Sequence, residues 1–138
     1  MSDLLAVLDA AVVKAATVTG IAGASDGGLM EMPGAPYALV YLNAGSGVQS
    51  GLMTLADELE IRVYIPKTAL PPAYRALLPF PDRFETVWRT DRDLGGTCLD
   101  SWYAGHGKVE LESWGGIDYL FLPIRIGVLR TAAADLSP

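Results

Sequence analysis

Hydrophobic residues follow two different spacings along the chain. From residue 4 to about residue 18 they recur every three or four positions, a pattern that predicts an amphipathic helix with Leu5 on its inward stripe. Ser2 or Asp3 is the expected N-cap of this helix. From residue 59 to residue 65 apolar and polar side chains alternate, which predicts a β-strand that Pro66 ends.

The same reasoning predicts further elements of both kinds. Short helices are expected at 70–78, with Leu78 facing inward, and at 82–89, and strands at 37–42, 98–103, 108–114 and 117–129. The glycine pair at 115–116 predicts a turn before the last strand. Pro123 lies inside that strand and lacks a backbone N–H, so a bulge or bend is expected there.

Two segments lack periodicity and predict loops. Residues 20–36 contain five glycines and two prolines, and residues 43–51 contain three glycines and two serines. Long loops in small domains are often functional, and these two are candidates to become ordered when a partner docks.

The order of elements indicates the fold class. A helix, two strands, two helices and three strands, joined by short links, predict an α+β domain. Its mainly antiparallel sheet would have about four or five strands, with helices packed on one face. A length of 138 residues and 51% hydrophobic side chains fit a single domain over 1–138, folded over 1–130, with 131–138 as a flexible tail.

Charge and composition exclude several function classes. A net charge of −6 argues against wrapping nucleic acid, which depends on clustered Lys and Arg. One cysteine and one histidine form neither an intramolecular disulfide nor a His/Cys metal site, and fit a reducing cytosol. The chain shows neither a basic secretion signal nor an apolar run of membrane-spanning length, so no membrane association is expected.

The stretch DRDLGGTCLD at 91–100 has the residue types of an active site. Asp91, Asp93 and Asp100 are candidates for an acid and base pair, and Cys98 for a nucleophile activated by the only histidine, His106. His106 is flanked by glycines and lacks a second ligand cluster, which favours a solvated turn residue.

A structural reading of this stretch is simpler. Asp93 is expected to cap a turn in which Gly95 and Gly96 adopt positive φ, before a strand begins. The glycine pair lacks the lysine of a phosphate-binding loop, and the chain has no G-x-G-x-x-G motif. We therefore predict no catalytic, cofactor-binding or metal-binding residues, and no cofactor.

Aromatic residues suggest an interaction surface. Trp88 is expected in the core, whereas Trp102 and Trp114 lie beside glycines and carboxylates and fit a core or an interface equally well. The last strand is apolar on both faces near its start, which predicts that a partner chain covers one of them. The candidate interface residues are Tyr64, Trp102, Trp114, Tyr119 and Phe121.

Together these features resemble the tail terminator, or tail completion, proteins of long-tailed bacteriophages. The resemblance runs from about residue 3 to residue 130 and rests on five segments. They are the N-terminal helix, the strand at 37–42, EIRVYI at 60–65, a helical segment ending in DLGGT at 93–97, and YLFLPIRI at 119–126.

The resemblance implies a structural virion protein that is not an enzyme. Proteins of this family are small α+β domains that form hexameric rings, cap the tail tube and join the tail to the filled head. The implied partners are further copies of the chain, the tail tube protein and a neck or head-completion protein, with DNA passing through the lumen unbound. Such a protein is made in the cytoplasm of the bacterial host and resides in the virion. A head-side connector or stopper is the alternative within this context, and a small enzyme or ligand-binding domain is the alternative outside it.

Overall fold

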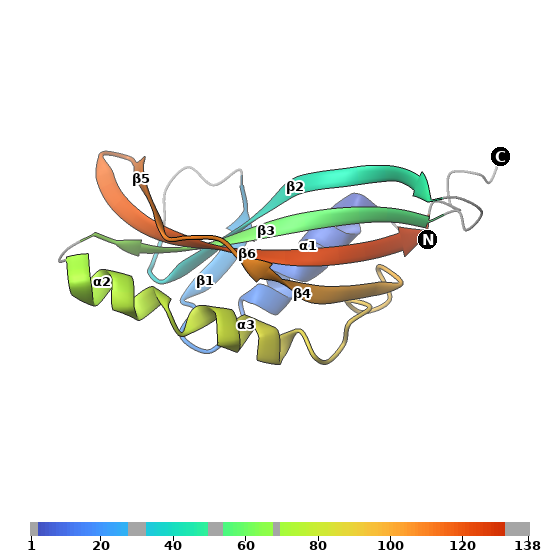
Figure 1. Ribbon diagram of the computed structural model, residues 1–138, viewed down its shortest axis with the longest axis horizontal. Coiled ribbons are helices and arrows are strands. Elements are labelled where there is room, and N and C mark those ends of the chain that lie inside the picture. The colour runs from blue at the N-terminus through green and yellow to red at the C-terminus, as the bar shows by residue number, and fades with distance from the viewer. Residues whose placement is uncertain (1–2, 28–32, 50–53, 68–69, 132–138) are drawn as a thin grey trace.

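The computed structural model describes residues 3–27, 33–49, 54–67 and 70–131. Within these ranges the chain forms three helices and six strands, shown in Figure 1. In chain order they are α1 (Leu4–Ala15), β1 (Gly23–Asp26), β2 (Tyr37–Gln49), β3 (Thr54–Pro66), α2 (Leu70–Leu77), α3 (Phe80–Val87), β4 (Asp100–His106), β5 (Glu110–Trp114) and β6 (Ile117–Thr131).

The strands form one mixed sheet in the order β1-β2-β3-β6-β4, and β5 pairs with β6 beyond the end of β4. Only the pairing of β1 with β2 is parallel, and the other pairings are antiparallel. The predicted α+β class and mainly antiparallel sheet are therefore confirmed, but the sheet has six strands instead of four or five. The extra strand is β1, which is short and was hidden in a glycine-rich segment.

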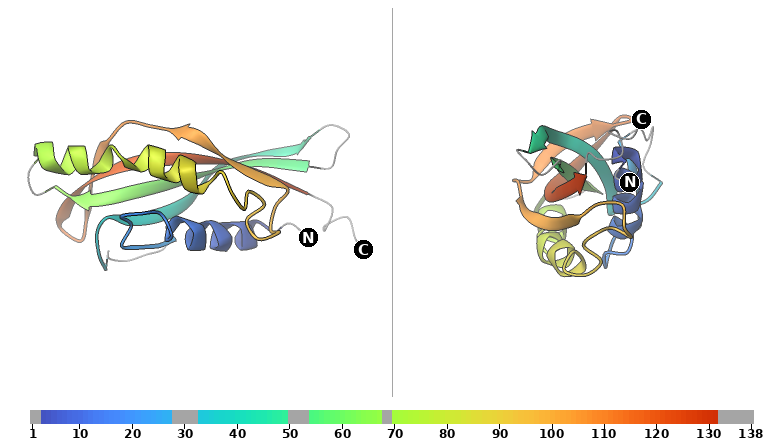
Figure 2. Two further views of the ribbon diagram at one scale, coloured as in Figure 1. Left: turned by 90° about the horizontal axis from the view of Figure 1, so that it is seen from below. Right: turned by 90° about the vertical axis from the view of Figure 1, so that its right-hand side faces the viewer.

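All three helices pack on the same face of the sheet, as Figure 2 shows. Asp3 is the N-cap of helix α1, and its side chain accepts a hydrogen bond from the Leu5 amide at 2.9 Å. The helix buries Val7, Ala11 and Ala15. Helix α3 buries Phe80 and Phe84, and Trp88 follows at its C-terminus. The strand residues that meet these helices are Ala38, Val40, Leu59, Ile61, Val63, Leu120, Leu122, Ile124, Ile126 and Val128.

Strand β2 continues through most of the segment predicted as a loop. Its pairing with β3 runs to Gln49 opposite Thr54, with register shifts between Leu42 and Ala44 and between Gly45 and Val48. A β-bulge adds residues to one strand without ending its pairing with the next strand. Residues whose polar and apolar side chains do not alternate can therefore remain part of β2. The prediction of a loop at 43–51 was wrong for residues 43–49, and residues 50–51 lie outside the described part of the chain.

Pro123 does not interrupt the sheet. It stands opposite Arg62 in a β3–β6 register that has no shift, so the predicted bulge at this position is absent from that pairing. The Pro123 carbonyl accepts a hydrogen bond from the Gly107 amide at 2.9 Å, in the link between β4 and β5. Because the N and O atoms of a strand residue point to the same side, the proline nitrogen faces that gap and removes no hydrogen bond to β3.

Element boundaries moved by a few residues elsewhere. Strand β6 extends to Thr131, which pairs with Thr54. The folded part of the chain therefore includes residue 131, one residue beyond its predicted end at 130. The rest of the predicted tail, residues 132–138, lies outside the described residues.

Candidate functional site

The loop between α3 and β4 has an unusual backbone. Asp91, Leu94, Gly95 and Gly96 all have positive φ, at 49°, 51°, 68° and 87°. The Asp93 carbonyl accepts hydrogen bonds from the amides of Gly96 and Cys98, both at 3.1 Å. The side chain that accepts a loop amide is Asp91, whose Oδ1 lies 3.3 Å from the Gly95 nitrogen, so the side-chain cap predicted for Asp93 is made by Asp91.

Side chains from two other elements hold this loop in place. Arg92 donates to both carboxylate oxygens of Asp100, at 2.9 and 2.7 Å. The Ser101 hydroxyl donates to the Arg92 carbonyl at 2.7 Å and accepts from Trp88 Nε1 at 3.0 Å. Lys14 of α1 donates to the carbonyl of Asp91 at 3.0 Å. These hydrogen bonds fasten the loop to α1 and to β4.

Cys98 and His106 do not form a catalytic pair. The Cys98 side chain is buried, and burial raises the pKa of its thiol to about 11, an effect that the Asp93 carboxylate increases. His106 is exposed and lies at the opposite end of β4, roughly 20 Å along a strand that rises about 3.3 Å per residue. A thiol this basic, without a neighbouring imidazole, is a poor nucleophile at neutral pH.

The sheet face opposite the helices carries a second apolar cluster. Its buried members are Tyr37, Leu39, Tyr64, Tyr119 and Phe121. The Tyr64 ring meets the Trp114 ring edge-on at 6.1 Å and the Tyr119 ring at 6.2 Å, which brings the β5–β6 hairpin onto β3. Three predicted interface residues, Tyr64, Tyr119 and Phe121, are at most 7% exposed, so they are internal to the subunit. Residues of this chain cover these three side chains, and whether a partner chain contacts this face stays a prediction.

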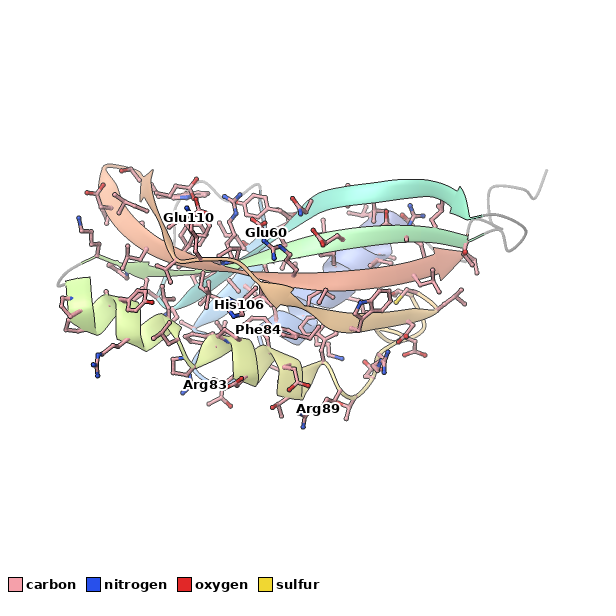
Figure 3. All side chains as sticks on the ribbon, viewed as in Figure 1. Glu60, Arg83, Phe84, Arg89, His106 and Glu110 are labelled. Atoms are coloured by element: carbon pink, nitrogen blue, oxygen red, sulfur yellow. The ribbon has the colours of Figure 1, made fainter. Side chains whose placement is uncertain are left out.

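Arg62 is the charged centre of this cluster. Its guanidinium lies 4.8 Å from the ring centroids of both Tyr41 and Phe121 and forms ion pairs with Glu60 at 2.5 Å and Glu112 at 3.7 Å. Figure 3 shows Glu60 on the far side of the sheet from Phe84 of α3.

A hydroxyl and an indole complete the network around Arg62. The Tyr64 hydroxyl donates to Glu112, and Trp114 Nε1 donates to the same carboxylate at 3.2 Å. Burial raises the pKa of Tyr64, and its hydrogen bond to Glu112 raises it further. With these partners in place, the network serves to fasten the β5–β6 hairpin rather than to offer unpaired groups to a ligand.

The two remaining candidate residues differ in exposure. Trp102 of β4 is 38% exposed and packs against Gly127, where an added Cβ would stand 2.6 Å from its indole nitrogen. Trp114 is half-buried against Tyr64. Of the five predicted interface residues, Trp102 is the most exposed.

The other exposed large apolar side chains are spread over helices, strands and loops, and Val13 of α1, at 69%, is the most exposed of them. Tyr74, Leu78, Leu111 and Ile117 are exposed toward the end where β6 begins, and Leu5, Leu42, Leu99 and Trp102 toward the end where β6 finishes. Leu5 and Leu78 correct the sequence prediction, which placed both inward: they are 62% and 48% exposed. Helical spacing alone does not distinguish the buried stripe from its neighbour when both contain leucines.

The described residues contain no group of three His, Cys, Asp or Glu side chains placed to hold a metal ion. Over the same part of the chain, none of the helices has the length and apolar character needed to cross a membrane. No protein-family model matches the chain, and a search of curated proteins found no similar sequence.

Proposed function

We propose that the protein is a structural virion component of a long-tailed bacteriophage, a tail terminator whose six copies form a ring on the tail tube. The ring would join the tail to a neck or head-completion protein, and DNA would pass through it. A subunit in this role needs surfaces that contact neighbouring subunits and the tail and neck proteins, and it needs no catalytic site.

The observation that carries this proposal is the presence of exposed large apolar side chains toward both ends of the sheet. A ring is built from heterologous contacts, in which each subunit uses two different surfaces to meet two neighbours. Large apolar side chains that are exposed in a subunit are available for contacts with neighbouring subunits. The α+β fold with all helices on one sheet face also agrees with the fold that the resemblance implies.

Charge and loop geometry favour the same role. A net charge of −6 suits a lumen through which DNA slides, since unpaired phosphates are repelled by acidic walls. The buried Cys98 thiol, remote from His106, favours a structural role over a cysteine-based enzyme. The loop at 91–96 would then serve to set α3 against the sheet.

Negative-stain electron microscopy of the concentrated protein tests the proposal. We expect ring-shaped particles with sixfold symmetry and a central opening wide enough for duplex DNA. Particles without an opening, or a lumen lined by clustered Arg and Lys in a higher-resolution reconstruction, would contradict it.

A further inference from the structure

Helix α2 packs on β3 and β6 and leaves part of the neighbouring strand β5 open. Leu111 of β5 pairs with Leu120 of β6, so both side chains point to the sheet face on which the helices lie. Leu120 is buried, whereas Leu111 is 56% exposed. Apolar surface on the helix side of the sheet therefore continues past α2.

An apolar groove, which we call the α2–β5 groove, lies at this position. Its described lining residues are Pro71 and Tyr74 of α2, Val109 of the link between β4 and β5, and Leu120, and its volume is about 350 Å³. Tyr74 is 46% exposed and Val109 is half-buried, so the groove is open to solvent. These lining residues carry no charge, and the groove has room for an aliphatic side chain.

Two cations border the α2–β5 groove. Arg75 of α2 and Lys108 of the β4–β5 link each adjoin a lining residue, and both are exposed and without an ion-pair partner in the described part of the chain. The carboxylate of Glu110 lies on the other sheet face (Figure 3), and Asp118 accepts a hydrogen bond from Ser113 at 2.6 Å. An apolar groove with cations on its rim suits a segment that carries an apolar side chain next to a carboxylate.

The segment 132–138, AAADLSP, has this combination. It follows β6 in the sequence and lies outside the described residues. Leu136 is its one large apolar residue and Asp135 is its one charged residue. Because the two are adjacent, Leu136 can enter the groove while the carboxylate of Asp135 stays at the rim.

Leu136 cannot reach the α2–β5 groove of its own chain. The groove lies at Leu120, eleven residues before Thr131, which is roughly 36 Å along a strand that rises about 3.3 Å per residue. Leu136 stands five residues beyond Thr131, and a fully extended chain of that length spans at most about 18 Å. Figure 1 shows α2 at the opposite end of the sheet from the end of β6. The groove that Leu136 can enter therefore belongs to another copy of the chain.

We propose that the segment 132–138 of one subunit docks in the α2–β5 groove of a neighbouring subunit. Leu136 fills the groove, and Asp135 pairs with the rim cations Arg75 and Lys108. The segment leaves one end of the sheet and the groove lies at the other, so each subunit uses two different surfaces and the contact can repeat around a ring. The use of this contact to close a ring rests on the proposed function.

Disulfide cross-linking tests the docking directly. In a Cys98→Ala background, Val109→Cys with Leu136→Cys places one thiol in the groove and one on the segment, and oxidation should give disulfide-linked multimers on a non-reducing gel. Glu110→Cys with Leu136→Cys is the matched control, because Glu110 is the next residue along the chain but lies on the other sheet face. The control should cross-link about tenfold more slowly or less. Equal rates, or a disulfide within one chain, would overturn the proposal.

Light scattering over a concentration series tests the two side chains of the segment. Leu136→Asp places a carboxylate in an apolar groove and should raise the concentration of half-assembly by about tenfold or more. Ser137→Asp, which adds the same charge one residue further on, is the matched control and should assemble normally. Asp135→Lys should also weaken assembly, and combining it with Arg75→Glu and Lys108→Glu restores opposite charges and should return to within about fivefold of the wild type.

The outcomes separate this inference from the ring itself. A hexamer that tolerates Leu136→Asp and forms no cross-link through Val109→Cys would overturn the docking and leave the ring standing. A closed dimer that forms the cross-link and that Leu136→Asp dissociates would support the docking and overturn the ring. Assembly that Arg75→Glu with Lys108→Glu weakens but Leu136→Asp does not would assign the groove to another surface of a second copy and overturn the docking. Wild-type protein that is monomeric at every concentration and forms no cross-link would overturn both.

Discussion

Replacing Ser101 by alanine removes a hydroxyl from a side chain that is 0% exposed. That hydroxyl accepts a hydrogen bond from Trp88 Nε1 and donates one to the Arg92 carbonyl. The variant Ser101→Ala leaves the buried indole N–H without an acceptor. The Arg92 carbonyl keeps only a weak contact with Cys98 Sγ at 3.8 Å.

The expected loss of stability follows from these two groups. A buried donor left unsatisfied costs about 1–3 kcal/mol, and a lost hydrogen bond costs about 1 kcal/mol more, which totals about 2–4 kcal/mol. The entropy of unfolding is about 2.1 cal/mol/K per residue, or about 0.29 kcal/mol/K for 138 residues. The midpoint of thermal unfolding should therefore fall by about 7–14 °C.

Thermal and urea unfolding, followed by circular dichroism, measure this loss. Ser113→Ala is the matched control, because Ser113 is exposed and bonds to the exposed Asp118, and it should change stability little. In a Trp88→Phe background, which lacks the indole donor, Ser101→Ala should cost about 1–3 kcal/mol less. A Ser101→Ala loss below about 0.5 kcal/mol, with no coupling to Trp88, would refute the claim that this contact fastens the loop.

Three further predictions concern other buried groups. The pKa of about 11 that burial gives the Cys98 thiol predicts slow labelling by a thiol reagent at pH 8 in native protein and rapid labelling in urea; equal rates would contradict it. Gly127→Ala should displace the Trp102 ring, lower stability by about 1–3 kcal/mol and increase acrylamide quenching of tryptophan fluorescence, whereas unchanged quenching would argue against close packing of the ring on Gly127. Asp57→Ala removes the buried carboxylate that pairs with Arg130, whose side chain is 16% exposed, and should cost about 1–3 kcal/mol in urea unfolding. Glu85→Ala, which breaks an exposed pair, should change stability little, and similar losses for the two variants would contradict the difference in burial.

Periodic segments were predictable from the sequence, and segments that depend on distant pairing were not. The alternation at 59–65 identified the centre of β3, but its pairing with β2 determines that the glycine-rich residues 43–49 become strand. Strand β1 at 23–26 exists because it pairs in parallel with Tyr37–Val40, a contact that local propensity does not reveal.

The candidate interface shows the same division. Alternation separated Tyr64 and Phe121 from the helix-facing residues of their strands, and the structure places both on the other sheet face, where they are buried. The sequence could not indicate that the β5–β6 hairpin and Arg62 would cover that face within one subunit, since this depends on side chains 50 or so residues apart meeting in space. The exposure of Leu78 was missed because it fits an inward helix pattern as well as the buried Leu77 does.

Native mass spectrometry of the purified chain over a concentration series tests the central claim most directly. The account predicts a hexamer whose share rises with concentration at the expense of the monomer. A monomer at every concentration, or a closed dimer as the largest species, would contradict the ring.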